Sequence, residues 1–390
     1  MNKKARKETL LKGRTILQIL PALETGGVET TTLEVGSALI KTGARAFVAS
    51  SGGKMESNFL ASGGTAFHLP LHRKTPWHLL KNTFSLVRLI KREKVDLVHA
   101  RSRFPAWSAF WAARFCRVPF ITTFHGTYNF KNKVKKFYNS IMTRGDIIIA
   151  NSRFTAQHME KIYHVGPQHI RIIPRGVDTD CFDPKNFNEE TRQKQLISWG
   201  IDPSHNIPVL FLPGRLTSWK GQAIFLKALT YLSELHFVAV LAGDDQGRTY
   251  YKHTLEKFIQ KEKLEKCVKI VGHCDNMPQA LYAATCMISA STDPEAFGRV
   301  MIEALAMERP VIATEHGGAL EIIEPGETGF LVPPSDSYAL AKAIERLLLL
   351  TDFERHEMGK KGRTYIQKHY TTKLLQQATL GVYLDVLAKG

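Results

Sequence analysis

The sequence predicts an α/β protein built from two doubly wound domains. Short, continuously apolar runs of strand length alternate with longer segments that have helical spacing, and the rhythm restarts near residue 209. Continuously apolar strands that alternate with helices are typical of parallel sheets covered on both faces. The length of 390 residues suits two such domains. Ligands of such sheets bind beyond the carboxyl ends of the strands, so we expect the functional residues in a cleft between the domains.

The first half contains the following candidate elements, in chain order. Apolar runs predict strands at 15–20, 44–50, 66–69, 97–100, 119–124, 147–150 and 170–174. Helical spacing predicts helices at 29–41, 77–92 and 105–115. Together they make a complete doubly wound unit, which we predict to span 1–182.

The second half repeats this pattern after a polar stretch. Residues 183–208 contain Pro184, Pro203 and Pro208 and read as a linker with some helix at 189–199. Strands are predicted at 209–213, 237–242, 268–271, 287–290 and 311–313, and helices at 221–231, 250–262, 277–283, 300–306 and 338–350. We predict a second domain over 183–370.

Composition excludes several classes of protein. Hydrophobic residues make up 44% and charged residues 23%, which is ordinary for a globular enzyme and excludes disordered, collagen-like and coiled-coil chains. No apolar run approaches the roughly 20 residues of a membrane span. The N-terminal segment Met1 to Arg14 is basic but lacks a signal sequence's apolar region, so we expect a cytoplasmic protein. Five cysteines without a CxxC pair argue against a disulfide framework or a zinc ribbon.

The net charge of +17 is unevenly distributed. Residues 1–180 hold 29 Lys or Arg and 11 Asp or Glu, a net charge of +18, whereas residues 181–390 hold 24 and 25, a net charge of −1. This asymmetry indicates an anionic partner for the first half: nucleic acid, an anionic membrane or a phosphate-rich substrate. A solvated basic surface is the alternative.

Two motifs of the second half could bind a phosphorylated sugar. Arg215 and Lys220 follow the strand at 209–213 and precede a helix, so both cations stand where anions bind. The segment 295–303 places Glu295 and Glu303 eight residues apart across a strand-to-helix turn. Glu303 falls in an otherwise apolar helix and therefore needs a partner, which could be a ribose diol or a neighbouring arginine, Arg299 or Arg309.

Two weaker motifs lie in the first half. Gly26 and Gly27 open a helix after the first strand, where backbone can approach a phosphate, but the third glycine of GxGxxG is missing. His125 follows a strand and precedes Gly126, so its side chain could reach the cleft or serve structure alone.

Together these motifs resemble the retaining GT-B glycosyltransferases of family 4. The resemblance rests on Gly26-Gly27-Val28-Glu29, His125-Gly126, Gly176-Val177-Asp178, Gly214-Arg215, Lys220-Gly221 and the pair Glu295 and Glu303. It covers nearly the whole chain. It implies a GT-B fold of two Rossmann-like domains facing a cleft, with a C-terminal helix at about 371–390 that crosses back to the first domain.

The resemblance also implies roles for individual residues. Arg215 and Lys220 would hold the donor diphosphate, Glu303 the ribose hydroxyls and Glu295 the donor sugar, with the backbone of Phe297, Gly298, Arg299 and Val300 nearby. Gly26 and Gly27 would let the first loop meet the phosphate, and His125 would bind the sugar, at its C6 hydroxyl. We expect the loop with His273 to contact the base.

Shorter motifs resemble the lipopolysaccharide-core branch of Gram-negative enzymes. They are residues 17–23, 99–108, 242–248 and 271–275. This branch implies transfer of a hexose, with mannose expected, from a GDP- or UDP-linked donor to an anionic glycolipid. Arg101 and Arg103 would meet the acceptor. The resemblance implies no metal requirement, because the two cations take its place, and retention through same-face attack, since no residue suggests a covalent nucleophile.

The basic first half suggests a peripheral site on the inner face of the cytoplasmic membrane. Residues 128–138 interleave Lys131, Lys133, Lys135 and Lys136 with aromatic and apolar residues, and we expect this segment to meet the bilayer. For the similar stretch at 77–94 we expect the apolar stripe to pack on the sheet.

Two alternative functions stay open. A family 4 enzyme that acts on a soluble or polysaccharide acceptor would share the donor motifs. A nucleic-acid-binding protein would explain the charge, but no helix-turn-helix, RRM or zinc signature is present, and we expect no nucleic-acid partner.

Overall fold

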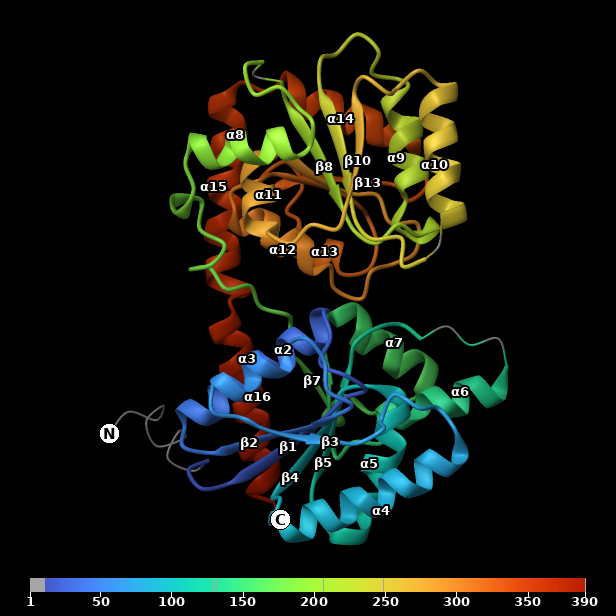
Figure 1. The fold of residues 1–390 in the computed structure, drawn as a ribbon, viewed down its shortest axis with the longest axis vertical. Helices are drawn as coiled ribbons and strands as arrows, with labels where there is room; N and C mark the ends of the chain where they lie inside the picture. The colour runs from blue at the N-terminus through green and yellow to red at the C-terminus, as the bar shows by residue number, and fades with distance from the viewer. Residues whose placement is uncertain (1–10, 129, 131, 206, 248, 390) are drawn as a thin grey trace. The chain divides into compact units, whose positions relative to one another are not determined.

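The computed structural model describes residues 11–128, 130, 132–205, 207–247 and 249–389 (Figure 1). The chain forms two compact units. Unit 1 contains the chain up to Arg175 and returns with Thr372 and the residues after it, and unit 2 contains Gly176–Thr371. The sequence-based boundaries lay at 182/183 and 370/371. Residues 176–182 are held within unit 2 because Arg363 Nη1 donates a hydrogen bond to the carbonyl oxygen of Phe182 (2.7 Å).

Unit 1 is built on a parallel sheet of seven strands within the described residues. The strands are β1 (Thr15–Ile19), β2 (Arg45–Ser50), β3 (Thr65–His68), β4 (Leu97–Ala100), β5 (Phe120–Phe124), β6 (Ile147–Ala150) and β7 (Ile170–Ile172). Their spatial order is β3-β2-β1-β4-β5-β6-β7, and Leu17 of β1 pairs with Phe47 on one side and Val98 on the other. The order reverses direction between β1 and β4, as in doubly wound folds.

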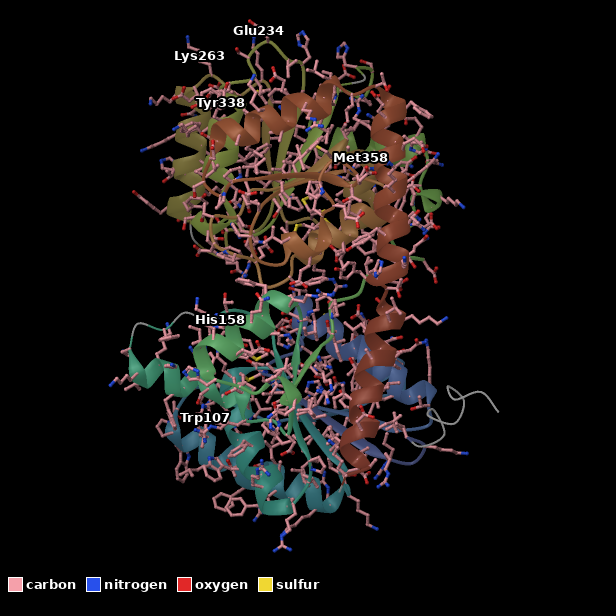
Figure 2. The ribbon with its side chains drawn as sticks, turned by 180° about the vertical axis from the view of Figure 1, so that it is seen from behind. Trp107, His158, Glu234, Lys263, Tyr338 and Met358 are labelled. Carbon is pink, nitrogen blue, oxygen red and sulfur yellow. The ribbon has the colours of Figure 1, made fainter. Side chains whose placement is uncertain are left out.

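Helices cover both faces of this sheet. One face packs against α2 (Gly27–Lys41), α3 (Glu56–Ala61) and α16 (Thr372–Leu387), and the other against α4 (Pro76–Arg92), α5 (Arg103–Cys116) and α7 (Arg153–Tyr163). The view from behind shows α16 lying against unit 1 (Figure 2), and α16 packs on α2. Side-chain caps begin two of the helices: Thr75 Oγ1 accepts the His78 N–H before α4, and Ser152 Oγ accepts the Thr155 N–H before α7.

Unit 2 repeats the architecture with six parallel strands among the described residues. They are β8 (Val209–Pro213), β9 (Val238–Ala242), β10 (Val268–Gly272), β11 (Cys286–Ser289), β12 (Val311–Thr314) and β13 (Gly329–Val332). The order is β10-β9-β8-β11-β12-β13, so the chain moves outward in opposite directions from the neighbouring strands β8 and β11.

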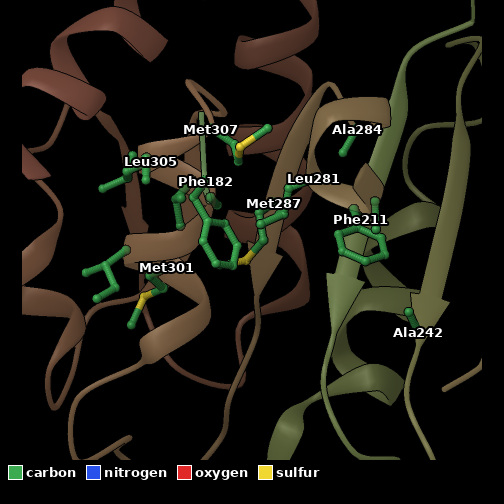
Figure 3. Packing of buried hydrophobic residues seen from close by; sticks show 14 of the residues in the cluster. Phe182, Phe211, Ala242, Leu281, Ala284, Met287, Met301, Leu305 and Met307 are labelled. Atoms are coloured by element: carbon green, nitrogen blue, oxygen red, sulfur yellow. The ribbon is translucent and has the colours of Figure 1, made fainter. Parts of the chain in front are cut away.

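Alternation along β8 explains why the core of unit 2 has two layers. Val209 and Phe211 face the layer of α8 (Glu189–Ser198), α11 (Met277–Ala283), α12 (Arg299–Ala306), α13 (Ala319–Ile322) and the end of α15 (Asp352–His369). Leu210 and Leu212 face the layer of α9 (Gln222–Leu229), α10 (Thr249–Lys261) and α14 (Ser337–Leu349). Figure 3 shows part of the first layer, with Phe182 among its labelled members.

The prediction of two doubly wound α/β domains is confirmed. Predicted strands differ from the observed ones by one or two residues at their ends. The sequence analysis missed the strand β13 and the helices α3, α7, α13 and α15. The strand β13 was missed because its apolar segment is short and begins with Gly329. The helix α15 was missed because most of its residues are polar, so the few apolar ones that are buried, such as Met358 and Ile366, give no clear helical periodicity.

One expectation about a helix of unit 1 is wrong, and the basic segment after β5 is only partly helical. The stripe of α4 does not pack on the sheet throughout: Trp77, Leu80 and Phe84 are exposed, whereas Leu86 and Ile90 are buried. The basic segment at 128–138 does not form one helix, because α6 covers only Lys133–Asn139. Lys131 lies outside the described residues, as do Met1 to Leu10 and Arg248.

The five cysteines are free thiols, and only Cys286 is fully buried. No helix of the described chain has the length and apolar character needed to cross a bilayer.

Replacing Arg363 by methionine is expected to destabilise unit 2. The guanidinium donates to the carbonyl oxygens of Phe182 and Ala306 and to Asp183 Oδ2 (2.7 Å), so its loss leaves buried acceptors unsatisfied. We expect the free energy of unfolding, measured in urea, to fall by about 3 kcal/mol. Lys361→Met removes an exposed ion pair with Glu327 and should cost less than about 1 kcal/mol. Equal effects of the two substitutions would contradict this account.

Candidate active site in unit 2 and a polar cluster in unit 1

The switch point of the unit 2 sheet lies between β8 and β11. The loops that follow these two strands carry Arg215 and Lys220 on one side and Glu295 on the other. Open α/β sheets bind ligands at the carboxyl ends of the strands where the order reverses. The topology therefore puts three of the predicted residues in the place where such a sheet binds ligands.

Two glycines permit close backbone contacts between the loops that follow β8, β9 and β11. Gly221 has a φ of +73°, and a Cβ there would come within 1.7 Å of the Ala290 carbonyl oxygen at the end of β11. A Cβ on Gly243, after β9, would come within 1.9 Å of the Gly214 carbonyl oxygen. Both contacts are backbone contacts, which cannot yield by a side-chain rotation, so the site requires glycine at 221 and 243.

Lys220 and Glu295 meet at this point. Lys220 Nζ donates to Glu295 Oε1 at 2.8 Å, and only 16% and 17% of the two side chains are exposed. The same carboxylate oxygen accepts Ser291 Oγ at 2.7 Å. Burial on its own raises the pKa of Glu295, but the Lys220 ammonium and the serine hydroxyls outweigh it, so the pKa lies below its usual range. Glu295 is therefore an ionised hydrogen-bond acceptor at neutral pH.

Arg215 is held by its backbone rather than by its side chain. Gln222 Nε2 donates to the Arg215 carbonyl oxygen (3.0 Å), and Gln222 itself is buried. The Arg215 side chain is exposed and forms no ion pair with any residue that the structure describes. The loop thus presents one oriented ammonium, Lys220, and one guanidinium that can turn toward an anion.

The loop after β11 leads into the first turn of α12. Gly298 precedes this helix with a φ of +95°, and Phe297 is buried beside Tyr370. The loop after β12 supports it: the Gly318 N–H donates to the Glu295 carbonyl oxygen (2.8 Å). α12 begins at Arg299 and Val300, so the amide groups of its first turn point toward the end of the sheet that carries Lys220.

Glu303 lies in α12 and has an arginine partner. Arg299 Nε donates to Glu303 Oε1 at 2.8 Å, one of the two partners that the sequence analysis left open. Glu303 is also near Cys181, in the turn that follows Val177. The pKa of the Cys181 thiol is raised by burial first and then by the negative charges of Asp178 and Glu303. The carboxylate is thus buried and oriented by an arginine.

His273 stands apart from these residues within unit 2. It follows β10, the edge strand two places from β8, and its largely exposed side chain lies 3.6 Å from an Asp275 carboxylate oxygen. A contact between this loop and a base stays a prediction.

In unit 1, Arg175 determines the tautomer of His125 and helps to keep its ring neutral. Arg175 Nη2 lies 2.7 Å from His125 Nδ1. A guanidinium can only donate, so Nδ1 must accept, and the proton of the neutral ring sits on Nε2. Burial, followed by the charges of Arg175 and Arg101, holds the pKa of His125 well below its usual range. The buried Nε2–H has no partner in the described structure and remains available as a donor.

Arg101 belongs to the same polar cluster. Its Nε donates to Gln18 Oε1 at 2.8 Å, it lies beside Tyr383, and its Nη2 is buried without a hydrogen-bond partner. A cavity of about 10 Å³ lies between Arg101, His99, Thr123 and Arg175, which is room for roughly one water molecule. The predicted acceptor residue Arg101 is therefore an interior side chain of unit 1.

Arg103 and the two glycines have simpler surroundings. Arg103 is the first residue of α5, where it stacks on the Tyr128 ring at 4.2 Å and donates to Asn139 Oδ1 at 2.7 Å. Gly26 precedes α2 and Gly27 begins it. A Cβ on Gly27 would meet nothing within 4 Å, so the space beside this glycine is open.

Sequence reasoning missed Arg175, Ser291 and Tyr383. Arg175 directly precedes the motif Gly176-Val177-Asp178, which is the signal that could have found it. Tyr383 lies 284 residues from its partner His99, and nothing in the sequence connects the two. No three His, Cys, Asp or Glu side chains of the described chain gather into a possible metal site, and independence from metal stays a prediction.

Comparison with known proteins agrees with this fold and site. Residues 25–181 match the family described as Glycosyltransferase Family 4, and residues 193–365 match Glycosyl transferases group 1. A glycosyltransferase from Rickettsia africae has a similar structure, with a TM-score of 0.89 and 34% identity over 97% of this chain and 100% of that one. This chain therefore belongs to the glycosyltransferases with a family 4 and a group 1 domain, and its fold is GT-B.

More distant proteins share the architecture. D-inositol 3-phosphate glycosyltransferase of Corynebacterium jeikeium is 25% identical over 315 residues, which are 75% of this chain and 74% of that protein. The structure of Anabaena HepE in complex with UDP and glucose has a TM-score of 0.83 and 22% identity over 94% of this chain and 98% of that one. At that identity the likeness supports the fold.

The state of His125 can be tested by nitrogen-15 NMR of the histidine rings, assigned with His125→Gln. We expect a neutral ring with the proton on Nε2, which stays neutral below pH 6.5 because its pKa is lowered. Arg175→Met should raise that pKa and allow the other tautomer. Arg171→Met, which removes only hydrogen bonds to local carbonyl groups, should change neither. A wild-type ring protonated on Nδ1 would contradict the geometry.

Proposed function

We propose that this glycosyltransferase moves a hexose, with mannose expected, from a nucleoside-diphosphate sugar to a hydroxyl group of an anionic glycolipid. The observation that carries the proposal is the contact between Lys220 and Glu295 at the switch point of unit 2. It puts a cation suited to phosphate next to a carboxylate suited to sugar hydroxyls. A nucleoside-diphosphate sugar has both groups, because its sugar is joined to the diphosphate directly through the bond between C1 and a phosphate oxygen.

In this proposal Lys220 and Arg215 lower the barrier by stabilising the leaving group. The bond between the sugar C1 and the phosphate oxygen breaks, and negative charge grows on the diphosphate as it leaves. Cations that are already oriented stabilise that charge without reorganising. Lys220 meets this requirement because Glu295 and the Trp219 ring, 4.6 Å from Nζ, hold it. The amide groups at the start of α12 add to the stabilisation.

Glu295 would bind the sugar as an acceptor of hydrogen bonds. One of its oxygens is taken by Lys220 and Ser291, and the low pKa keeps the group ionised. The carboxylate is not expected to act as the nucleophile, because an anion paired with an ammonium at 2.8 Å is a poor one. We propose retention instead: the acceptor hydroxyl attacks C1 from the side the diphosphate leaves, and its proton passes to the departing phosphate oxygen.

Glu303 would bind the ribose. It is a buried carboxylate oriented by Arg299, and a ribose offers two hydroxyl donors to it. For the base we retain the proposed contact with the loop of His273. We also retain the prediction that the Nε2–H of His125 meets a sugar hydroxyl, for which its fixed tautomer is suited.

The acceptor proposal rests on charge. The first 180 residues carry a net charge of +18, which suits an acceptor rich in phosphate or carboxylate groups, with lipopolysaccharide core as the expected class. Arg103, half-buried at the start of α5, could meet such groups, whereas Arg101 would act from the interior. A lipid-linked acceptor implies work at the inner face of the cytoplasmic membrane.

The donor can be identified by thermal shift and calorimetry with a panel of nucleoside diphosphates and their sugars. A ligand at about 100 times its Kd should stabilise the protein by about 2.7 kcal/mol. We expect either the GDP or the UDP series to bind, with the mannose conjugate stabilising most. Binding of an oligonucleotide and of no nucleotide sugar would contradict the proposal.

The same binding measurements test whether Glu303 binds the ribose, when a ribonucleotide is compared with its 2′,3′-dideoxy analogue. Wild type should bind the ribonucleotide more tightly than its 2′,3′-dideoxy analogue, because the analogue leaves the buried carboxylate without its hydroxyl donors. Glu303→Gln should bind both alike, at about 10- to 100-fold lower affinity for the ribonucleotide. Glu327→Gln, at an exposed ion pair of unit 2, should keep the preference. A Glu303→Gln protein that still prefers the ribonucleotide would remove Glu303 from the site.

A further inference from the structure

Two neighbouring helices of unit 1, α4 and α5, carry large apolar side chains on exposed faces. On α4 these are Trp77 (71% exposed), Leu80 and Phe84 (68%), and on α5 they are Trp111 and Phe115 (70%). Monomeric proteins seldom expose so many large side chains together, and such a patch usually marks an interaction surface.

The five side chains belong to one surface because of how the helices pack. Ser108 Oγ donates to the Leu79 carbonyl oxygen (3.0 Å), and Cys116 Sγ lies 3.8 Å from the Val87 carbonyl oxygen. Both pairs are 29 positions apart, so α4 and α5 run parallel and side by side. With an offset of 29, Trp111 of α5 lies level with position 82 of α4, and Phe115 lies level with position 86. Both are therefore about half a helical turn along the axis from Phe84. Figure 1 shows α4 along the outer edge of unit 1, with α5 beside it.

The spacing on each helix also gathers the side chains. Trp77, Leu80 and Phe84 are three and seven residues apart, and Trp111 and Phe115 are four apart, which is the spacing of one helix face. The opposite face of α4 already packs in the core through Leu86, Leu89 and Ile90. The exposed side chains are therefore not needed to attach α4 to unit 1.

Cations surround these apolar side chains, and acids are missing from both helices. Lys81, Arg88 and Lys91 share the exposed face of α4 and form no ion pair within the described residues. Residues 72–92 contain Arg73, Lys74, Lys81, Arg88, Lys91 and Arg92 and no Asp or Glu, and residues 101–117 contain no Asp or Glu either. The aliphatic stems of lysine and arginine can lie along an apolar surface while their charges reach outward.

We propose that the α4–α5 face, made of Trp77, Leu80, Phe84, Trp111 and Phe115 with Lys81, Arg88 and Lys91, docks the protein on a bilayer that contains anionic lipids. Tryptophan and phenylalanine insert at the boundary between headgroups and acyl chains, and the cations meet the lipid phosphates. A second copy of the chain fits less well, since two such faces would bring like charges together. Nucleic acid offers no apolar layer to cover five large side chains.

This inference rests on the proposed function, which puts the enzyme at a membrane, and adds the surface of unit 1 that makes the contact; it requires a lipid surface and no particular sugar. It also changes the surface that the sequence suggested. α6 (Lys133–Asn139) exposes only Val134 and Phe137 as large apolar residues, beside a hollow of about 310 Å³ lined by lysines and Tyr163. Its lysines provide a matched set of cations without a comparable apolar face.

Co-sedimentation of the full chain with vesicles tests the proposal. Wild type should bind vesicles of phosphatidylcholine and phosphatidylglycerol, bind pure phosphatidylcholine weakly, and lose affinity as salt screens the charges. The charge variant Lys81→Gln/Arg88→Gln/Lys91→Gln should lose on the order of 100-fold, at about fivefold for each cation near an anionic surface. The apolar variant Trp77→Ser/Phe84→Ser/Phe115→Ser should lose about tenfold or more.

The matched control is Lys133→Gln/Lys135→Gln/Lys136→Gln on α6, which should bind within about threefold of wild type if α4–α5 is the docking face. The altered side chains are exposed, except Lys136, which is half-buried over the Phe130 and Tyr163 rings, so unfolding and nucleotide binding should stay close to those of wild type. Nucleotide binding reports on unit 2 independently, so a failure of the proposed function and a failure of this inference give different results.

Tryptophan fluorescence locates the contact. Tryptophan emission should shift to shorter wavelength on anionic vesicles and be quenched by brominated acyl chains, and Trp77→Phe/Trp111→Phe should remove most of this signal while keeping binding. Four results would overturn the proposal: no binding of wild type to anionic vesicles, unchanged binding of both α4–α5 variants, loss of binding in the α6 variant alone, or an apolar-dependent dimer in sedimentation velocity. Tighter binding of an oligonucleotide through the same residues would also overturn it.

Discussion

The contact between the Lys220 ammonium and the Glu295 carboxylate constrains the whole site of unit 2. The two side chains meet where the loop after β8 approaches the loop after β11, which Gly221 permits at backbone distance; Gly243 likewise lets the loop after β9 lie against the loop after β8. The two strands are neighbours although β9 and β10 separate them in the chain. Sheet topology, two glycines and one ion pair therefore depend on one another. A phosphate that enters meets an ammonium whose orientation is already fixed.

Unit 1 uses positive charge in two different ways. In its interior, Arg101 and Arg175 lie beside histidines whose pKa values are lowered by burial and then by these charges, and Arg175 determines which nitrogen of His125 carries the proton. On its surface, the cations of α4 have no acidic neighbours on their helix and stand among exposed aromatic rings. The interior cations orient polar groups at short range, whereas the surface cations act through a field that salt can screen.

The sequence was sufficient for every strand of the two sheets except β13 and for the residues near the carboxyl ends of the strands, because apolar strands and loop motifs are local signals. The order of the strands could not be predicted, because no local signal in the sequence determines it. The same holds for the pairing of Lys220 with Glu295, which are 75 residues apart. The stripe of α4 shows a second limit. Helical periodicity identifies an apolar face but cannot tell which residues a neighbouring element covers, so Trp77 and Phe84 were expected to be packed and are exposed. The buried Arg175 was missed for a related reason, since its partners Thr31 and His125 come from other elements.

The most direct test of the central claim is calorimetry with UDP, GDP, uridine and guanosine on wild type and Lys220→Met. The claim is that Lys220, oriented by Glu295, holds the diphosphate. Wild type should bind one diphosphate much more tightly than its nucleoside, and Lys220→Met should lose about 1.5–3 kcal/mol of diphosphate binding with nucleoside binding unchanged. A Lys220→Met protein that keeps the full preference for the diphosphate would contradict the account.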